Sequence, residues 1–161
     1  MRVAEIVPAS IVNGDGTRIV IVFQGCSLNC AGCFSPELQQ FDVGKEMSPI
    51  HLAKYVTEMF SENKLLDGLT LSGGNPTEQF ELVDFLIELR KLMPKLDICM
   101  WTGHTWEELN DFKYRHSPLP YIDMVISGRF EINKKVEHQY YGSSNQEVWR
   151  KNDNVWSKNN S

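Results

Sequence analysis

Apolar residues in this chain gather into short runs, separated by longer segments in which they recur every three or four positions. The clearest run, RIVIVF at residues 18–23, is rich in β-branched side chains and predicts a buried strand. GLTL at 68–71, DICMW at 97–101 and the run at 122–127 have the same character and predict three more strands. Glycine follows each run closely, which predicts where each strand ends.

Helical periodicity fills the intervals between these runs. A helix is predicted from Ser48, an N-cap residue followed by proline, to about Phe60. A second is predicted over 77–93, before Pro94. Its positions near helical spacing are Phe80, Val83, Leu86, Ile87 and Arg90. A third is predicted over 105–112, where Thr105 and Glu108 can form a capping box.

Strand and helix alternating in this order predict βαβ units and a mainly parallel sheet. The length of 161 residues favours one α/β domain over 1–161, with a frayed polar tail from about Lys151 onward. Four βα units are too few for an eight-stranded barrel, so we expect a partial, incomplete β/α barrel. Its glycine breaks would lie at the carboxyl ends of the strands, the edge at which such folds bind ligands.

Composition narrows the classes of function. The formal charge is −5 and no large lysine–arginine cluster is present, so nucleic-acid binding is not expected. No stretch approaches the roughly 20 apolar residues of a membrane span. The N-terminus, MRVAEIVPAS, lacks the features of a secretory signal, so we expect the protein in the cytoplasm.

Three of the four cysteines lie within GCSLNCAGCF, residues 25–34. Cys30 and Cys33 alone could form a thioredoxin-like redox pair, but Cys26 would then have no role. Structural zinc is a second possibility, although no fourth ligand lies at a suitable spacing. An iron–sulfur cluster held by three thiolates, with one iron open to a non-protein ligand, uses all three cysteines. We expect the fourth cysteine, Cys99, in the core, as free cysteine often is.

The spacing C-x3-C-x2-C directly after the first predicted strand resembles the signature of the radical S-adenosylmethionine superfamily. Five further segments resemble, in order, those of the anaerobic ribonucleoside-triphosphate reductase activating protein family. They are IVNGDGTR (11–18), LSGGNP (71–76), MWTGHTWEEL (100–109), ISGRFE (126–131) and YGSSNQ (141–146). The resemblance covers about residues 11–149 and implies a radical-SAM type of fold.

What the resemblance implies is an activating enzyme. It would use a 4Fe-4S cluster to cleave S-adenosylmethionine reductively and generate a glycyl radical on the large subunit of an anaerobic ribonucleoside-triphosphate reductase. Its electron would come from a low-potential donor such as reduced flavodoxin. Two alternatives stay open: a radical enzyme acting on a small molecule, similar to 7-carboxy-7-deazaguanine synthase, and a non-catalytic iron–sulfur electron carrier, which would need four cysteine ligands per cluster.

The resemblance also implies roles for individual residues. Metal ligands would be Cys26, Cys30 and Cys33. Residues expected to bind S-adenosylmethionine are Gly32, Cys33, Phe34, Gly73, Gly74, Asn75, Pro76 and Thr102. In the family, the glycine-rich segment bonds the methionine amino group through its backbone, and the residues around the third cysteine lie against the adenine. The cluster and cofactor would do the chemistry without a further catalytic side chain.

Other polar and aromatic residues carry weaker expectations. Arg129 could meet a carboxylate of the cofactor or partner, or lie on the surface as an unspecialised residue. Trp101 and Trp106 are expected in the core. The four histidines share no ligand-like spacing and are expected at the surface or in loops; they are His51, His104, His116 and His138.

Overall fold

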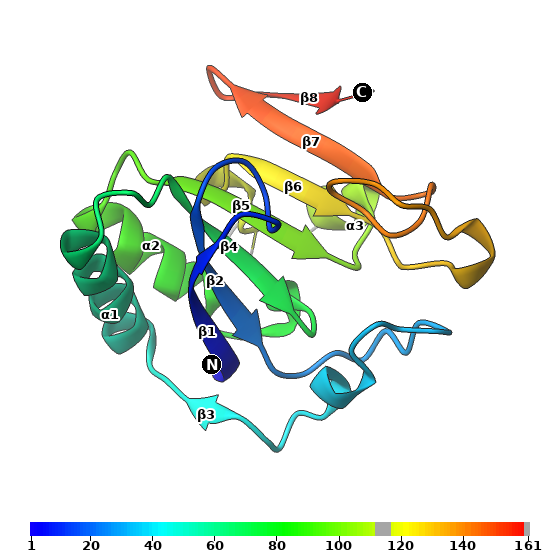
Figure 1. The fold of residues 1–161 in the computed structure, drawn as a ribbon, viewed down its shortest axis with the longest axis horizontal. Helices are drawn as coiled ribbons and strands as arrows, with labels where there is room; N and C mark the ends of the chain where they lie inside the picture. Colours follow the sequence, from blue (N-terminus) through cyan, green and yellow to red (C-terminus); the bar gives the residue numbers. More distant parts are fainter. Residues whose placement is uncertain (112–116, 160–161) are drawn as a thin grey trace.

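A single open sheet of eight strands organises the chain (Figure 1). The computed structural model describes residues 1–111 and 117–159. The strands are β1 (Arg2–Ser10), β2 (Arg18–Phe23), β3 (Lys45–Glu46), β4 (Gly68–Gly73), β5 (Asp97–Thr102), β6 (Met124–Ser127), β7 (Glu147–Asn152) and β8 (Val155–Asn159). The helices are α1 (Pro49–Glu62), α2 (Leu82–Leu92) and α3 (Trp106–Asp111), with 3-10 turns η1 (Pro36–Gln39), η2 (Pro76–Glu78), η3 (Leu119–Tyr121) and η4 (Ile132–Lys134).

The centre of the sheet is parallel, as expected for βαβ units. Strands β2, β4, β5 and β6 are neighbours in that order, and each pair is parallel. They correspond to the four apolar runs of the sequence, and their burial on both faces explains why those runs are almost continuous. The prediction of a mainly parallel α/β sheet is confirmed for this central part.

Antiparallel strands flank the parallel centre on both sides. On one side β1 pairs with β2, and the short β3 pairs with β1. The sequence did not predict β1, because Glu5 and Pro8 interrupt its apolar residues and much of the strand is exposed. On the other side β7 pairs with β6, and β8 follows. Because β3 and β8 are the two ends of the order, the sheet is not closed.

The polar end of the chain is paired rather than frayed as far as Asn159. Strands β7 and β8 form an antiparallel hairpin, connected through Asp153 and Asn154, which both have positive φ. Trp156 on β8 makes an edge-on contact with Trp106, at 5.2 Å between ring centroids. The expectation of a frayed tail from Lys151 is therefore wrong over the described part, because cross-strand bonds and this aromatic contact hold a polar sequence in place.

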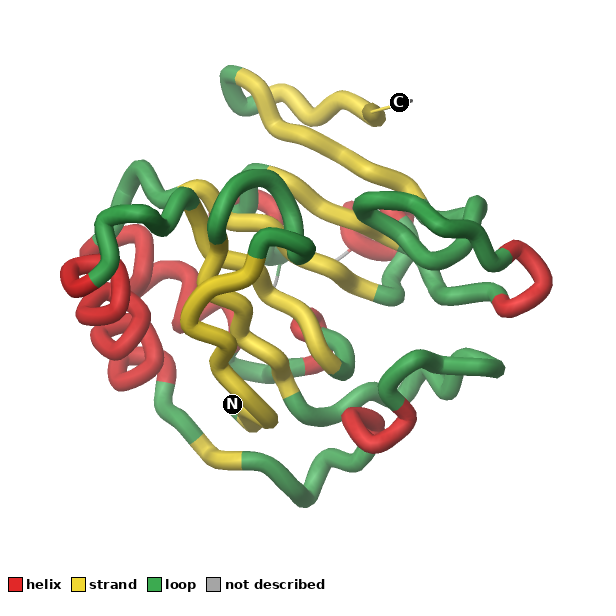
Figure 2. Tube along the Cα trace, in the orientation of Figure 1, coloured by secondary structure: helices red, strands yellow, loops and turns green. Residues whose placement is uncertain are grey.

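Helices α1 and α2 pack side by side against the sheet, and Figure 2 shows the helical and strand layers. The second helix begins later than predicted, at Leu82 instead of Thr77. Its buried face consists of Leu82, Phe85, Leu86 and Leu89, whereas Phe80, expected on the helical stripe, is 90% exposed. The later start of α2 follows from Gln79, the residue at which η2 ends. Its buried side-chain amide accepts from the Arg2 amide and donates to the Gln24 carbonyl, so the chain is fixed at this point before the helix begins.

The main core lies between the helices and one face of the sheet. Its fully buried side chains include Ile19, Ile21, Phe23, Leu69, Leu71, Ile98, Leu52, Val56 and Phe85. A smaller cluster holds Cys99, Met124, Ile126 and Val148, against which Trp101, Tyr140 and Tyr141 pack. Cys99 is therefore a core residue, as predicted. Within the described part of the chain, no helix is long and apolar enough to pass through a bilayer.

Candidate functional site

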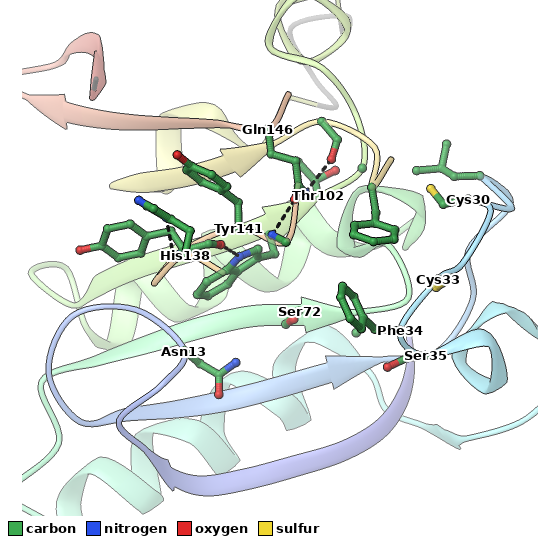
Figure 3. Close-up of a pocket in the computed structure, with 18 of the residues that line it drawn as sticks. Asn13, Cys30, Cys33, Phe34, Ser35, Ser72, Thr102, His138, Tyr141 and Gln146 are labelled. Atoms are coloured by element: carbon green, nitrogen blue, oxygen red, sulfur yellow. Dashed lines mark hydrogen bonds between the residues drawn. The ribbon is translucent and has the colours of Figure 1, made fainter. Parts of the chain in front are cut away.

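A cleft of about 580 Å³ lies along the carboxyl ends of the parallel strands (Figure 3). Its size is typical of sites that bind small molecules and cofactors. Four parts of the chain line it: residues 12–13 before β2, the cysteine loop, the ends of β4 and β5, and the segment that connects β6 to β7. The glycine breaks predicted from the sequence do lie at this edge of the sheet.

The cysteine loop, residues 25–34, leaves the end of β2 and carries three cysteines to the cleft. Cys26, Cys30 and Cys33 all line the cleft, all are half-buried, and none is in a disulfide. The Cys33 amide donates to the carbonyl of Cys30 at 3.1 Å, which makes a tight turn between these two ligand candidates. Positive φ at Gly25 (106°), Asn29 (47°) and Gly32 (72°) bends the loop back toward the sheet.

The donor set of this loop fits an iron–sulfur cluster. Three thiols on one short loop face a common cleft, and cysteine thiolates are the usual protein ligands of such clusters. Among the described residues, no three histidine, cysteine or acidic side chains are placed to hold one metal ion in common. A cluster does not require that convergence, because each thiolate binds an iron of its own. Burial raises the pKa of the Cys26 thiol, so ligation there would have to displace a proton.

The glycine motif, residues 73–76, begins at the end of β4 and packs directly against the cysteine loop. The Gly74 amide donates to the carbonyl of Phe23 at 2.8 Å, and the Asn75 amide donates to that of Gly25 at 2.9 Å. A Cβ on Gly74 would lie 2.8 Å from the carbonyl oxygen of Leu38. Both glycines line the cleft and leave backbone, rather than a side chain, exposed to a ligand.

Asn75 and Pro76 are buried and are not among the residues that line the cleft. The side-chain oxygen of Asn75, Oδ1, accepts hydrogen bonds from the hydroxyls of Thr102 at 2.8 Å and Thr77 at 2.9 Å. Thr102 itself reaches the cleft. Asn75 therefore lies behind the cleft wall and connects the glycine motif to the end of β5.

His104, expected at the surface or in a loop, does lie in the loop after β5, and its half-buried ring joins this network. Its Nδ1 lies 2.6 Å from the Thr77 hydroxyl and 3.3 Å from Nδ2 of the Asn75 side chain. Burial lowers the pKa of His104, although the nearby carboxylates of Glu108 and Glu78 oppose that shift. Of the other three histidines, His51 lies on α1, His138 lines the cleft, and His116 falls outside the described residues.

Aromatic residues form much of the cleft, and the sequence identified only part of them. Phe34 lines the cleft, is 65% exposed and contacts Phe130 at 4.7 Å between ring centroids. Gly32 does not line it and lies against Ile132. Trp101, expected in the core, is half-buried and faces the cleft, whereas Trp106 stacks on Trp149 at 4.1 Å beside the core.

The opposite wall of the cleft is here called the aromatic segment, residues 136–142; of these, only Tyr141 and Gly142 lie in a segment that carried the family resemblance. All seven of its residues line the cleft. The Trp101 indole donates to the Tyr140 carbonyl at 2.6 Å, and His138 stacks on Tyr141 at 3.8 Å. Apart from that resemblance, only the adjacent aromatic residues Tyr140 and Tyr141 suggest from the sequence that this segment is special. Its place in the cleft depends on contacts with residues that are distant in the sequence, such as Trp101.

A polar latch, formed by Asp15, Tyr140 and Arg150, ties the aromatic segment to the β1–β2 connection and to β7. The Tyr140 hydroxyl donates to one carboxylate oxygen of Asp15 at 2.6 Å, and Arg150 donates to the other at 2.7 Å. Asp15 lies between β1 and β2, and Arg150 lies on β7. Tyr140 and Arg150 together hold the pKa of Asp15 below its ordinary value. The latch therefore works best with the carboxylate ionised.

Arg129 does meet a carboxylate, but one from its own chain. It makes two parallel bonds of 3.0 Å to the two oxygens of Glu108. Glu108 also accepts from the Thr105 amide at 2.8 Å, while its own amide donates to the Thr105 hydroxyl at 3.2 Å. The capping box is confirmed, and it fixes the carboxylate that orients Arg129 beside the cleft.

Comparisons with known proteins agree with this geometry. A family model described as 4Fe-4S single cluster domain matches residues 12–149. Relatives that carry the name anaerobic ribonucleoside-triphosphate reductase-activating protein include the following three. The protein of Enterobacteria phage T4 is 30% identical, and the match covers 97% of this chain and 98% of the phage protein. The protein of Pasteurella multocida is 32% identical, and that of Haemophilus influenzae is 30% identical. Each of these two matches covers 93% of this chain and 98% of the relative.

Proposed function

We propose that this chain, which belongs to the family of the anaerobic ribonucleoside-triphosphate reductase-activating proteins, activates such a reductase by generating a glycyl radical on its large subunit. The observation that carries the proposal is the meeting of the three cysteines and the Gly73–Gly74 backbone in one cleft. Thiol donors and an open stretch of backbone are the two kinds of group that a cluster and an amino-acid cofactor require.

In this proposal Cys26, Cys30 and Cys33 hold the 4Fe-4S cluster, and S-adenosylmethionine occupies the cleft beside it. When both are bound, they supply one-electron reductive cleavage of the sulfonium and, through it, removal of a hydrogen atom from a glycine of the partner. The protein contributes binding, orientation and exclusion of water. The half-buried cysteines and the aromatic wall support that division of labour.

The chain's own residues would divide the work of binding the cofactor. Gly73 and Gly74 would present backbone groups to the methionine end, and Cys33 and Phe34 would flank the adenosine. Gly32 would shape the turn that leads from Cys30 to Cys33. Thr102 lies at the cleft surface. Asn75 and Pro76 act from behind, because their buried side chains set the path of the glycine motif.

We infer that the four parallel strands form the arc of an incomplete β/α barrel whose open side admits the glycine-bearing loop of the reductase. The unclosed sheet supports this inference. An external low-potential donor such as reduced flavodoxin would provide the electron. We also infer a cytoplasmic location, supported by four cysteines that are all unpaired. A carrier with four cysteine ligands is disfavoured, because Cys99 is buried in β5.

The test is anaerobic reconstitution followed by reaction with a candidate reductase. Reduced protein and S-adenosylmethionine should yield 5′-deoxyadenosine and, with the reductase present, a glycyl radical visible by paramagnetic resonance. The Cys30→Ala variant is the matched control and should yield neither. Cofactor cleavage without any protein radical would favour a small-molecule substrate, and failure of the wild-type protein to bind iron would overturn the proposal.

A further inference from the structure

One carboxylate outside the cleft lining holds the cysteine loop. The Ser27 amide donates to Oε2 of Glu78 at 2.8 Å, and the Ser27 hydroxyl donates to Oε1 of the same side chain. Glu78 is the last residue of η2, which begins at Pro76 of the glycine motif, and Ser27 directly follows Cys26. A single side chain thus joins the loop that carries the thiols to the segment that carries the glycines.

Backbone bonds hold the cysteine loop up to Cys26: the Gly25 amide donates to the Leu38 carbonyl at 2.8 Å, and the Gly25 carbonyl accepts from the Asn75 amide. The chain has no regular secondary structure from residue 24 to residue 30, so the order of the loop depends on individual contacts. The Cys26 amide donates to the Gln39 carbonyl at 3.1 Å, and Leu28 packs onto Gly103, where a Cβ would collide with its side chain. The later half of the loop instead rests on residues 130–142 through Phe34 and Gly32. Glu78 therefore supplies a side-chain anchor just beyond Cys26, in addition to the backbone bonds of Gly25 and Cys26.

We propose that Glu78 is a positioning residue for the cluster: its bonds to Ser27 hold Cys26 in place before the metal binds. The inference rests on the proposed function, because it concerns the same cysteines. A carboxylate that accepts two bonds from neighbouring donors of one residue restricts both its backbone and its side chain. Cys26 then loses most of its conformational entropy when the chain folds. Less entropy is lost when the cluster binds, and the affinity for the cluster is higher.

The first measurement is amide hydrogen exchange in the metal-free protein. Glu78→Gln keeps the shape of the side chain but places an amide group opposite the Ser27 donors, and Glu78→Ala removes the acceptor entirely. We expect the Ser27 amide to exchange about tenfold faster in both variants, because a bond to a charged acceptor is lost. Its amide proton resonance should also move upfield. Glu37→Gln, an identical charge change at an exposed position, is the control and should change neither.

The second measurement is the affinity for iron during anaerobic reconstitution with iron and sulfide, followed by absorbance. Loss of a residue that orients a metal ligand costs about tenfold or more in metal affinity, and we expect that loss in Glu78→Ala and Glu78→Gln. Their thermal unfolding should stay close to that of the wild type, which separates positioning from a general loss of structure. Ser27→Ala removes only the hydroxyl half of the anchor and should have a smaller effect.

The outcomes are distinct. Unchanged Ser27 exchange, or iron affinity in Glu78→Gln at or above the wild-type value, would overturn the role of Glu78 while leaving the proposed function intact. Wild-type protein that binds no cluster would overturn the proposed function, and the exchange experiment would still decide whether Glu78 anchors the loop. Non-additive effects in a Ser27→Ala, Glu78→Gln double-mutant cycle would support direct coupling between the two residues.

Discussion

Gly73 sits directly beside Phe23 on the neighbouring parallel strand, with its backbone in a conformation of positive φ. The register pairs the two residues, and φ at Gly73 is 104°. A Cβ at Gly73 would lie 2.5 Å from the Phe23 amide nitrogen and would also collide with the Phe23 carbonyl oxygen. The glycine is therefore required where β2 and β4 meet at the cleft, whatever ligand the cleft holds.

Gly73→Ala should be strongly destabilising. The left-handed backbone alone costs a residue with a Cβ about 1–2 kcal/mol, and the clash with Phe23 adds roughly 1–3 kcal/mol of strain. Gly128→Ala is the matched control: its φ is 109°, but the nearest atom to its Cβ would be 3.5 Å away. Denaturant unfolding should show the larger loss at Gly73. Equal losses at both positions would contradict the proposed crowding.

The cysteines should divide into three ligands and one core residue. Serine at position 26, 30 or 33 should abolish binding of a complete cluster, whereas Cys99→Ala should keep the iron content and lower the free energy of unfolding by about 1 kcal/mol. Iron and sulfide analysis with denaturant unfolding checks both parts. Loss of the cluster in Cys99→Ala, with the fold intact, would contradict this assignment.

Thiol alkylation of the metal-free protein gives an independent check. Burial raises the pKa of Cys99 to about 12 and also shields its sulfur. The thiolate is the reacting species, so Cys99 should be the last of the four to be modified at pH 8. Mass spectrometry of peptides over time measures the order. Early modification of Cys99 would mean that β5 opens more readily than its burial implies.

The half-buried His104 should make stability depend on pH. Because burial lowers the pKa of His104, the unfolded chain binds more protons than the folded one below about pH 6.5. The free energy of unfolding should therefore decrease as the pH falls from 7.5 to 5.5, and His104→Gln should reduce that slope. The imidazole resonance should titrate below the ordinary histidine value. Titration at or above that value would contradict the shift.

The latch at Asp15 should contribute stability that acid removes. Its folded pKa is lowered, so the contribution is present above the ordinary value near 4 and is lost as the pH falls through the folded pKa. Asp15 and Arg150 are partly exposed, so solvent screening limits the loss in Asp15→Asn to about 0.5 kcal/mol at neutral pH. Unfolding curves at pH 6 and pH 3 should show the difference shrinking. A constant difference would contradict the latch.

The sequence predicted the parallel centre of the fold because strands buried on both faces must be apolar throughout, as Ile19 and Ile21 are. It did not predict β1 or β8, whose pairing depends on strands already present beside them. Phe80 shows the same limit for helices. An apolar side chain at the right spacing was left exposed because Gln79 bonds distant backbone groups and sets the helix start.

The candidate site divides in a similar way. The cysteine loop and the glycine motif could be predicted from the sequence, because the residues of each lie within a few positions of one another. Asn75 was assigned to the cofactor, but its burial and its bonds to Thr102 and Thr77 could not be read from its neighbours in the chain. The role of the aromatic segment as a wall of the cleft was missed, because Trp101 and Asp15, which hold it there, are both far away in sequence.

The latch also bears on how the protein is made. Asp15 and Arg150 are separated by 135 positions, and Arg150 is synthesised after every residue that lines the cleft. On the ribosome, the nascent chain therefore carries its thiols and glycines before the opposite wall can be fastened. Metal delivered during translation would meet a site whose aromatic wall Arg150 does not yet hold, and metal delivered after release would meet that wall already in place.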